Sequence, residues 1–157
     1  VLEGAAPGLR DPAERATRMA SDEILARRLE QEGLVPFIDF WERLPLFATQ
    51  ERLPEDRRAA LRRKRLKNDA RGLANSLRGM GQGAQPYLGD RLGEVQVPVQ
   101  LLAGAEDTKF RALAEEMRAA LPHGRCVVIP DAGHAAHFER PEFFDEVVLG
   151  FLRAQLL

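Results

Sequence analysis

The residues best suited to proton-transfer chemistry are an aspartate and a histidine that each follow an apolar run. Asp107, within GAEDTKF, follows the run VPVQLLAG, and His134, within DAGH, follows CVVIP. A carboxylate bonded to one imidazole nitrogen fixes the tautomer of the ring, so that the other nitrogen is left to handle a proton. We therefore expect Asp107 and His134 to form the acid–base part of a catalytic triad.

The elements around these two residues predict how they are brought together. The runs at 95–104 and 125–130 are continuously apolar, which is typical of parallel strands buried on both faces, and the segments 108–122 and 141–157 have helical patterns. With VLEGA as a first strand, the fold class is α/β with parallel strands and crossover helices. Ligands bind at the carboxyl ends of such strands, where Gly133 would let the loop before His134 turn tightly.

The segment between the first two predicted strands is almost entirely helical. Asp11 as N-cap, Pro12 and Glu14 predict a helix that ends at Gly33, and one or two more helices follow between 54 and 81. The glycines of GMGQGAQ predict a helix stop and a hinge. The chain is thus divided into a strand leading into a cap (1–10), a helical cap (11–92) and an α/β part with the acid–base pair (93–157).

Four motifs together make the chain similar to one enzyme family. They are GAEDTKF, AGHAAHFERP, GLANSLRGMGQGAQPYL and FWERLPLFA. With them the chain resembles the C-terminal part, cap included, of 2-succinyl-6-hydroxy-2,4-cyclohexadiene-1-carboxylate synthase, a lyase of menaquinone biosynthesis with the α/β-hydrolase fold. The resemblance implies a cytoplasmic enzyme without a cofactor that eliminates pyruvate from 2-succinyl-5-enolpyruvyl-6-hydroxy-3-cyclohexene-1-carboxylate. In that reaction Asp107 orients His134, and His134 activates a serine.

The nucleophile of such a triad is not found in the sequence. It should lie in a G-x-S-x-G elbow, whereas Ser21 and Ser76 lie in helical patterns without flanking glycines. We therefore expect the chain to be inactive alone and its partner to be the missing N-terminal half of the same enzyme. Two other interpretations stay open: a different α/β-hydrolase, such as a carboxylesterase or C–C bond hydrolase, or an inactive fragment that only binds or assembles.

The resemblance also implies a small polyanionic substrate held by Arg18, Trp41 and Arg65. Arg65 lies four residues after Leu61 and Arg18 seven before Leu25, so each arginine shares a helical face with an apolar residue. Each of these substrate-binding predictions has a structural alternative. Seven cations within RRAALRRKRLK are typical of a solvated face, to which we assign Arg62, Arg63, Lys64 and Lys67. The tryptophan, with Phe37 and Phe40 nearby, would equally suit a core.

Composition argues against several other classes of protein. The net charge of −1, from 23 basic and 24 acidic residues, predicts no nucleic-acid partner, and no apolar run approaches the length of a membrane span. The single Cys126 suits a reducing compartment. His134 and His137 are three residues apart on a predicted loop without a Cys or His cluster, so we expect no metal and a loop-supporting role for His137. His123 is predicted to lie in a surface turn.

Overall fold

The computed structural model describes residues 1–156, which form two compact units. The sheet unit comprises Val1–Pro7, Leu46–Arg52 and the chain from Gly89 onward, and the helical unit comprises Gly8–Pro45 and Leu53–Leu88. Segment 46–52, which the sequence analysis placed in the cap, therefore belongs to the same unit as the sheet. The predicted final helix ends at Arg153, and residue 157 lies outside the described residues.

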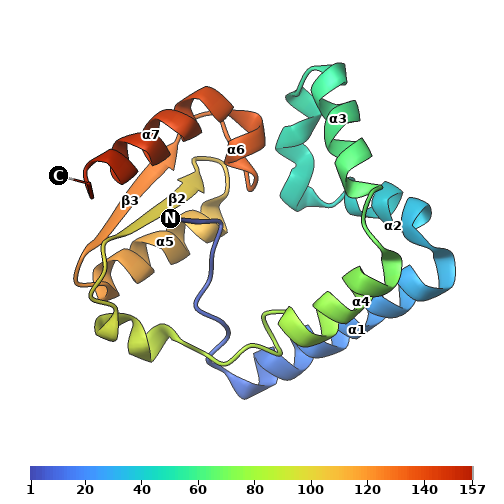
Figure 1. Ribbon diagram of the computed structural model, residues 1–157. Helices are drawn as coiled ribbons and strands as arrows, with labels where there is room; N and C mark the ends of the chain where they lie inside the picture. The colour runs from blue at the N-terminus through green and yellow to red at the C-terminus, as the bar shows by residue number, and fades with distance from the viewer. Residues whose placement is uncertain (157) are drawn as a thin grey trace. The chain divides into compact units, whose positions relative to one another are not determined.

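The sheet unit contains three parallel strands in the order β1-β2-β3 (Figure 1). They are β1 (Leu2–Glu3), β2 (Val99–Gly104) and β3 (Gly124–Ile129). Leu101 of β2 is in register with Leu2 on one side and Cys126 on the other. The α/β class and the parallel pairing are confirmed. The first strand is shorter than the predicted VLEGA, because Gly4 has a φ of 53° and turns the chain away.

The core of the sheet unit lies on both faces of β2, whose six residues are all buried. Helix α5 (Thr108–Ala120) covers the face with Leu101, and helices α6 (Ala136–Glu139) and α7 (Pro141–Arg153) cover the face with Leu102. Each buried leucine contributes about 1.5–3 kcal/mol. The runs at 95–104 and 125–130 were both predicted to be strands buried on both faces. This prediction holds for β2 but is wrong for β3. That strand is an edge with one neighbour, and its Val128 is 37% exposed.

The helical unit is built on α1 (Pro12–Glu32), which packs along α4 (Ala70–Met80). Asp11 caps α1 by accepting hydrogen bonds from the N–H groups of residues 13 and 14, as predicted, and Gly33 ends the helix with a φ of 84°. Between these helices the chain forms α2 (Leu34–Trp41) and α3 (Glu55–Arg65), and the 3-10 helix η1 (Pro45–Arg52) between those two belongs, except for Pro45, to the sheet unit. A second 3-10 helix, η2 (Gly89–Glu94), precedes β2.

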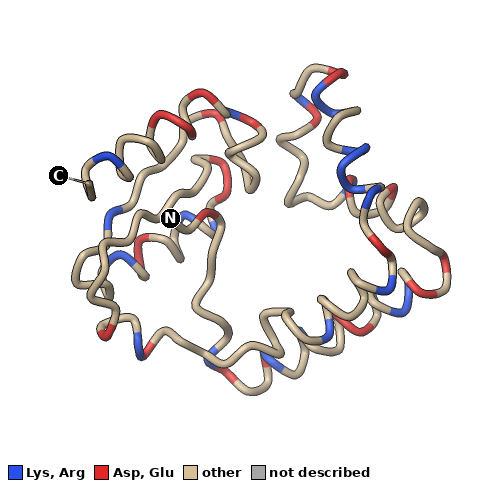
Figure 2. The backbone as a smooth tube through the Cα atoms, viewed as in Figure 1, with Lys and Arg blue, Asp and Glu red and all other residues tan. Residues whose placement is uncertain are grey.

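Charged residues of both signs lie along α1, whereas the charged residues of α4 are arginines (Figure 2). Arg78 of α4 bridges Glu23 and Glu30 of α1 with N–O distances of 2.7 and 2.6 Å. Hydrogen bonds from Arg78 and Arg27 lower the pKa of Glu23 to about 2. Within residues 1–156, no helix has both the length and the apolar composition required to span a bilayer.

The glycines predicted as a helix stop and hinge serve close packing. A Cβ on Gly81 would overlap the Asp22 carboxylate, and one on Gly83 would lie 2.7 Å from the Arg15 carbonyl oxygen. Arg15 Nε also donates to the Gly83 carbonyl at 3.2 Å. The turn after α4 is therefore pressed directly onto α1, which only residues without a side chain allow.

Candidate active site

Asp107 and His134 meet, as the sequence analysis predicted. The Asp107 Oδ2 and the His134 Nδ1 are 2.7 Å apart, with the carboxylate side chain 7% exposed and the imidazole 23% exposed. Because an ionised carboxylate can only accept a hydrogen bond, this pairing places the ring proton on Nδ1. The Nε2 of a neutral His134 is then the nitrogen that can accept a proton.

Asp107 also begins the helix that follows it. Its Oδ1 accepts a hydrogen bond from the Phe110 N–H at 3.2 Å, so the residue is the N-cap of α5. A capping carboxylate satisfies a helical N–H that would otherwise be unpaired. One side chain therefore holds both the helix and the imidazole. This role was missed, although an Asp directly before a predicted helix is a recognisable capping signal.

Two glycines allow the loops that carry the pair to approach each other. A Cβ on Gly104 would overlap the carbonyl oxygens of Ala132 and Gly133. The contact is reinforced by the Glu106 N–H, which donates to the Ala132 carbonyl at 2.9 Å. A Cβ on Gly133 would overlap the Thr49 hydroxyl. The predicted reason for Gly133 was therefore wrong: the residue is needed for close packing, and the positive φ of this loop, 52°, belongs to Asp131.

The imidazole of His134 is held by the groups around it. The ring centroid lies 4.6 Å from that of Phe110 and 6.2 Å from that of Phe47. On the β1 side, a Cβ on Gly4 would come within 3.0 Å of the His134 Cε1, so the glycine makes room for the ring. These contacts limit the orientations open to the ring and keep Nδ1 directed at the carboxylate.

Segment 46–52 braces the site in a way that the sequence analysis missed. Besides Phe47 and Thr49, it contributes Arg52, whose Nη2 lies 2.6 Å from the Glu106 Oε1. This hydrogen bond raises the pKa of Arg52. The pair is exposed and contributes little free energy by itself, about 0–1 kcal/mol. It nevertheless ties the segment to the residue immediately before Asp107, over 54 positions of sequence.

The second histidine of the motif has a partner of its own. His137 pairs through Nδ1 with the Glu3 Oε2 at 2.7 Å, and its backbone N–H donates to the Glu3 Oε1 at 3.0 Å. Among the described residues, no group of three or more His, Cys, Asp or Glu side chains is arranged to hold a metal ion. His123 is exposed, as expected for a surface turn.

The three residues predicted to bind substrate all lie in the helical unit. Arg18 on α1 pairs through Nε with the buried carboxylate of Asp22 at 2.8 Å, and its Nη1 lies 3.4 Å from the Gln82 Oε1. Arg65 on α3 is 17% exposed and pairs with Glu42 at 2.9 Å. Each arginine is thus held by the unit itself, and its contact with substrate stays a prediction.

The aromatic residue and one further cation have structural contacts. Trp41 stacks on Phe37 with ring centroids 5.6 Å apart and packs against the helical core, and its role as a pocket wall stays a prediction. Arg62, predicted to be part of a solvated face, bridges Asp39 and Glu42 at 2.6 and 2.8 Å. The Arg62 side chain is still 35% exposed, and the two acidic residues that reach it from the end of α2 are not indicated by any local pattern.

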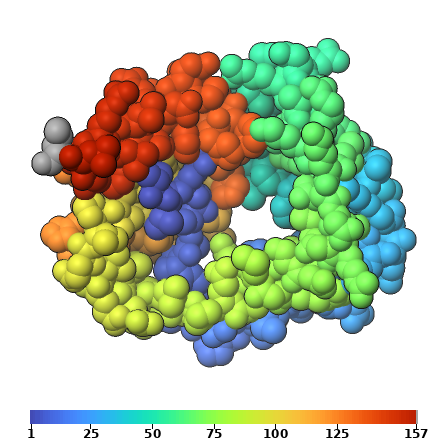
Figure 3. All heavy atoms as spheres, viewed as in Figure 1, coloured from blue at the N-terminus to red at the C-terminus, as the bar shows by residue number. Residues whose placement is uncertain are grey.

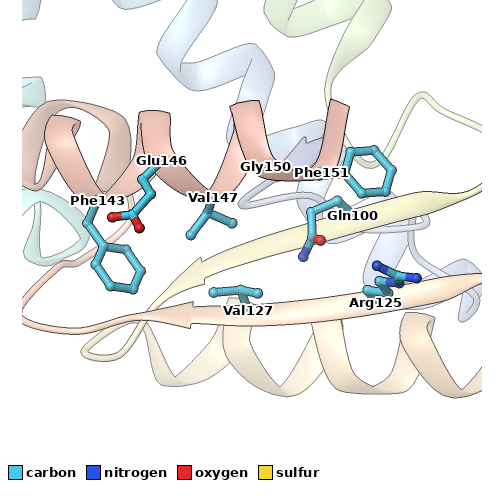
Figure 4. Close-up of a pocket in the computed structure, with 8 residues that line it drawn as sticks. All are labelled: Gln100, Arg125, Val127, Phe143, Glu146, Val147, Gly150 and Phe151. Atoms are coloured by element: carbon cyan, nitrogen blue, oxygen red, sulfur yellow. The ribbon is translucent and has the colours of Figure 1, made fainter. Parts of the chain in front are cut away.

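A cavity of about 340 Å³ lies elsewhere in the sheet unit, between the sheet and α7 (Figure 4). Gln100 and Arg125 line it near the amino ends of β2 and β3, facing Phe143, Val147 and Phe151 of α7. Asp107 and His134 follow the carboxyl ends of the same strands. The cavity is therefore separate from the acid–base pair.

Comparison with known proteins shows the family to which the chain belongs. Residues 2–147 match the model of the alpha/beta hydrolase family, and the chain belongs to that family. Within it, the chain is a homologue of 2-succinyl-6-hydroxy-2,4-cyclohexadiene-1-carboxylate synthase, which confirms the resemblance. A candidate synthase of Bacillus subtilis (strain 168) is 45% identical over 152 residues, covering 97% of this chain and 56% of the relative. The synthase of Serratia proteamaculans (strain 568) is 34% identical over the same shares.

A solved structure agrees with these relatives. MenH from S. aureus superposes with a TM-score of 0.97 and 36% identity, covering 99% of this chain and 59% of that chain. The chain thus spans little more than half the length of the relatives that it matches.

Proposed function

We propose that this chain carries the Asp and His of the Ser-His-Asp triad of a 2-succinyl-6-hydroxy-2,4-cyclohexadiene-1-carboxylate synthase. The observation that carries the proposal is the 2.7 Å contact between Asp107 and His134 at the carboxyl ends of neighbouring parallel strands. It is supported by the similarity to relatives that bear this name. The serine would come from the remaining part of the enzyme, since the relatives are longer than the chain.

In the proposed reaction the chain's own residues move and hold a proton. The Nε2 of His134 takes the proton of the serine hydroxyl as that oxygen removes a proton from the substrate. The electron pair released by the substrate then cleaves the C–O bond and expels the enolate of pyruvate, which takes up the proton held on His134 Nε2 and becomes pyruvate. Asp107 stabilises the imidazolium that forms and keeps Nδ1 protonated throughout. No covalent acyl intermediate is required.

The helical unit would supply the grip on the small polyanionic substrate. Arg18 and Arg65 are proposed to bind carboxylates, for which a guanidinium is suited by its planar array of donors. Trp41 is proposed to form a wall of the pocket. The pairs with Asp22 and Glu42 would hold the two guanidinium groups in place without using all their N–H donors.

The decisive test uses a chimera in which this chain replaces the matching part of MenH from S. aureus. Pyruvate release from the synthase substrate is expected, together with loss of that activity in His134→Ala. Asp107→Asn keeps an oxygen for the Phe110 N–H but presents an amide to the histidine. It should therefore lower kcat by about 10⁴, the effect of this change in serine-protease triads.

The outcomes of this test separate the possibilities. A chimera that folds but hydrolyses carboxylic esters and releases no pyruvate would overturn the lyase assignment in favour of an esterase. A folded chimera whose pyruvate release is indifferent to His134→Ala would overturn the triad. The 157-residue chain alone should show neither activity.

Substrate binding is tested in the same chimera by Arg65→Ala. Removing a charge-assisted contact should lower kcat/KM, by an amount that corresponds to a loss of about 2–3 kcal/mol of transition-state stabilisation. Arg63→Ala is the matched control, because Arg63 lies on the same helix and is exposed. Equal kinetics for the two variants would remove Arg65 from the site.

A further inference from the structure

Helix α6, which is separated from His134 by a single residue, lacks the features that usually stabilise a helix. It has only four residues, Ala136–Glu139, and its N-cap is Ala135, whose side chain makes no capping hydrogen bond. Helices this short do not form without outside support, because nucleation fixes several residues for a single hydrogen bond. The contacts that hold α6 in place must therefore come from elsewhere in the fold.

Glu3 of β1 supplies the missing cap from a distant part of the chain. Its Oε1 accepts from the N–H of His137, the second residue of α6, at 3.0 Å, which is the contact that an N-cap side chain normally makes. Its Oε2 pairs with Nδ1 of the same histidine at 2.7 Å. The two oxygens thus fix the backbone and the side chain of one residue, across 134 positions of sequence.

The far end of α6 acts on the residue before His134. Glu139, the last residue of the helix, is buried with 8% exposed, and its Oε2 accepts from the Gly133 N–H at 2.8 Å. When α6 is formed, this carboxylate is in position to accept the hydrogen bond from the Gly133 amide. If the helix frays, the hydrogen bond is lost and the adjacent histidine loses an anchor.

The residue that follows β1, Gly4, also lies beside the imidazole. The N–H of Gly4 donates to the Leu102 carbonyl at 3.1 Å, which fixes this glycine beside β2. With no Cβ, it lies against the Cε1 edge of the His134 ring. The strand before this glycine pairs with β2, and Figure 3 shows the N-terminal residues, in dark blue, at the surface beside the C-terminal segment, in red. Glu3 of β1 therefore contacts His137, and the next residue, Gly4, lies beside His134.

We propose that Glu3 is a positioning residue for His134, acting through His137 and α6. The consequence for catalysis rests on the function proposed above, whereas the positioning itself does not. The same conclusion explains why two histidines are three residues apart: His134 carries the proton, and His137 receives the cap that holds the loop.

The test uses the nitrogen-15-labelled 157-residue chain and needs no activity. Two readouts are followed: amide exchange of residues 133–139, and the ring nitrogen shifts of His134, which report which nitrogen carries the proton. Glu3→Ala removes the cap, and should accelerate exchange in this segment roughly 5–30-fold, as expected for a lost cap. It should also move His134 from the Nδ1-protonated tautomer toward a mixture.

Two further variants make the result specific. Glu115→Ala is the matched control, because it removes a glutamate of the sheet unit from its exposed ion pair with Arg118, and should leave both readouts unchanged. His137→Asn should behave like the unaltered chain, since an amide nitrogen replaces Nδ1 as a donor, whereas His137→Ala should resemble Glu3→Ala. The proposal is overturned if Glu3→Ala leaves segment 133–139 and the His134 tautomer unchanged, or changes exchange equally throughout the chain.

Kinetics in the chimera then separate this proposal from the proposed function. If His134→Ala abolishes pyruvate release, Glu3→Ala should lower kcat with little change in KM. A chimera without activity would count against the proposed function, while the readouts on the isolated chain would still decide the role of Glu3.

Discussion

Replacement of Gly104 by alanine should damage the site more than any nearby change of similar size. The added Cβ would overlap the carbonyl oxygens of Ala132 and Gly133, which are backbone atoms and cannot rotate away. The loop before His134 must therefore move. Overpacking of this kind costs about 1–3 kcal/mol, and two backbone hydrogen bonds at this contact, from Ala105 to Ile129 and from Glu106 to Ala132, are each worth about 0.5–1.5 kcal/mol.

The expected loss of stability is about 2–6 kcal/mol, a large part of what a domain possesses. Urea denaturation followed by circular dichroism and by amide exchange of β2 would measure it. Gly150→Ala is the matched control: nothing lies within 4 Å of its Cβ position, and alanine in the middle of α7 should stabilise the chain by about 0.5–1 kcal/mol. Equal unfolding midpoints for Gly104→Ala and the unaltered chain, with the His134 tautomer preserved, would refute the reasoning.

Two predictions concern the helical unit, where the fluorescence of Trp41 reports unfolding. Arg18→Ala leaves the buried carboxylate of Asp22 without its cation and should destabilise the unit by about 1–3 kcal/mol. The double change Arg18→Ala/Asp22→Asn should restore most of this stability. A double variant no more stable than the single one would contradict the prediction. Because the pKa of Glu23 is lowered to about 2 from 4.5, its contribution is fully present above pH 4.5 and is lost as the pH falls toward 2. Arg78→Gln should flatten this acid dependence, and an unchanged titration would show that the ion pairs do not stabilise the unit.

The sequence predicts the parts of this fold that depend on local signals. The apolar run before Gly104 identifies β2, and Asp11 with Pro12 marks the start of α1. Asp107 and His134 could be paired because parallel strands end at a common edge, so their positions relative to two strands were sufficient.

The features that were missed depend on pairings between distant segments. Arg52 reaches Glu106 over 54 positions and Glu3 reaches His137 over 134, and no periodicity reports such contacts. The exposure of Val128 in β3 could not be foreseen either, since it depends on the number of neighbouring strands and not on the strand's own composition. Gly133 was recognised as important for the wrong reason, because a requirement for space and a requirement for positive φ both select glycine.

The double use of the carboxylate at position 107 limits how this protein could be redesigned. A library selected only for resistance to heat would still return a capping residue at this position, because the residue that starts α5 is the one that faces the imidazole. Stabilising substitutions and catalytic ones cannot be explored separately there. An engineer who wishes to change the chemistry would first have to provide α5 with another N-cap.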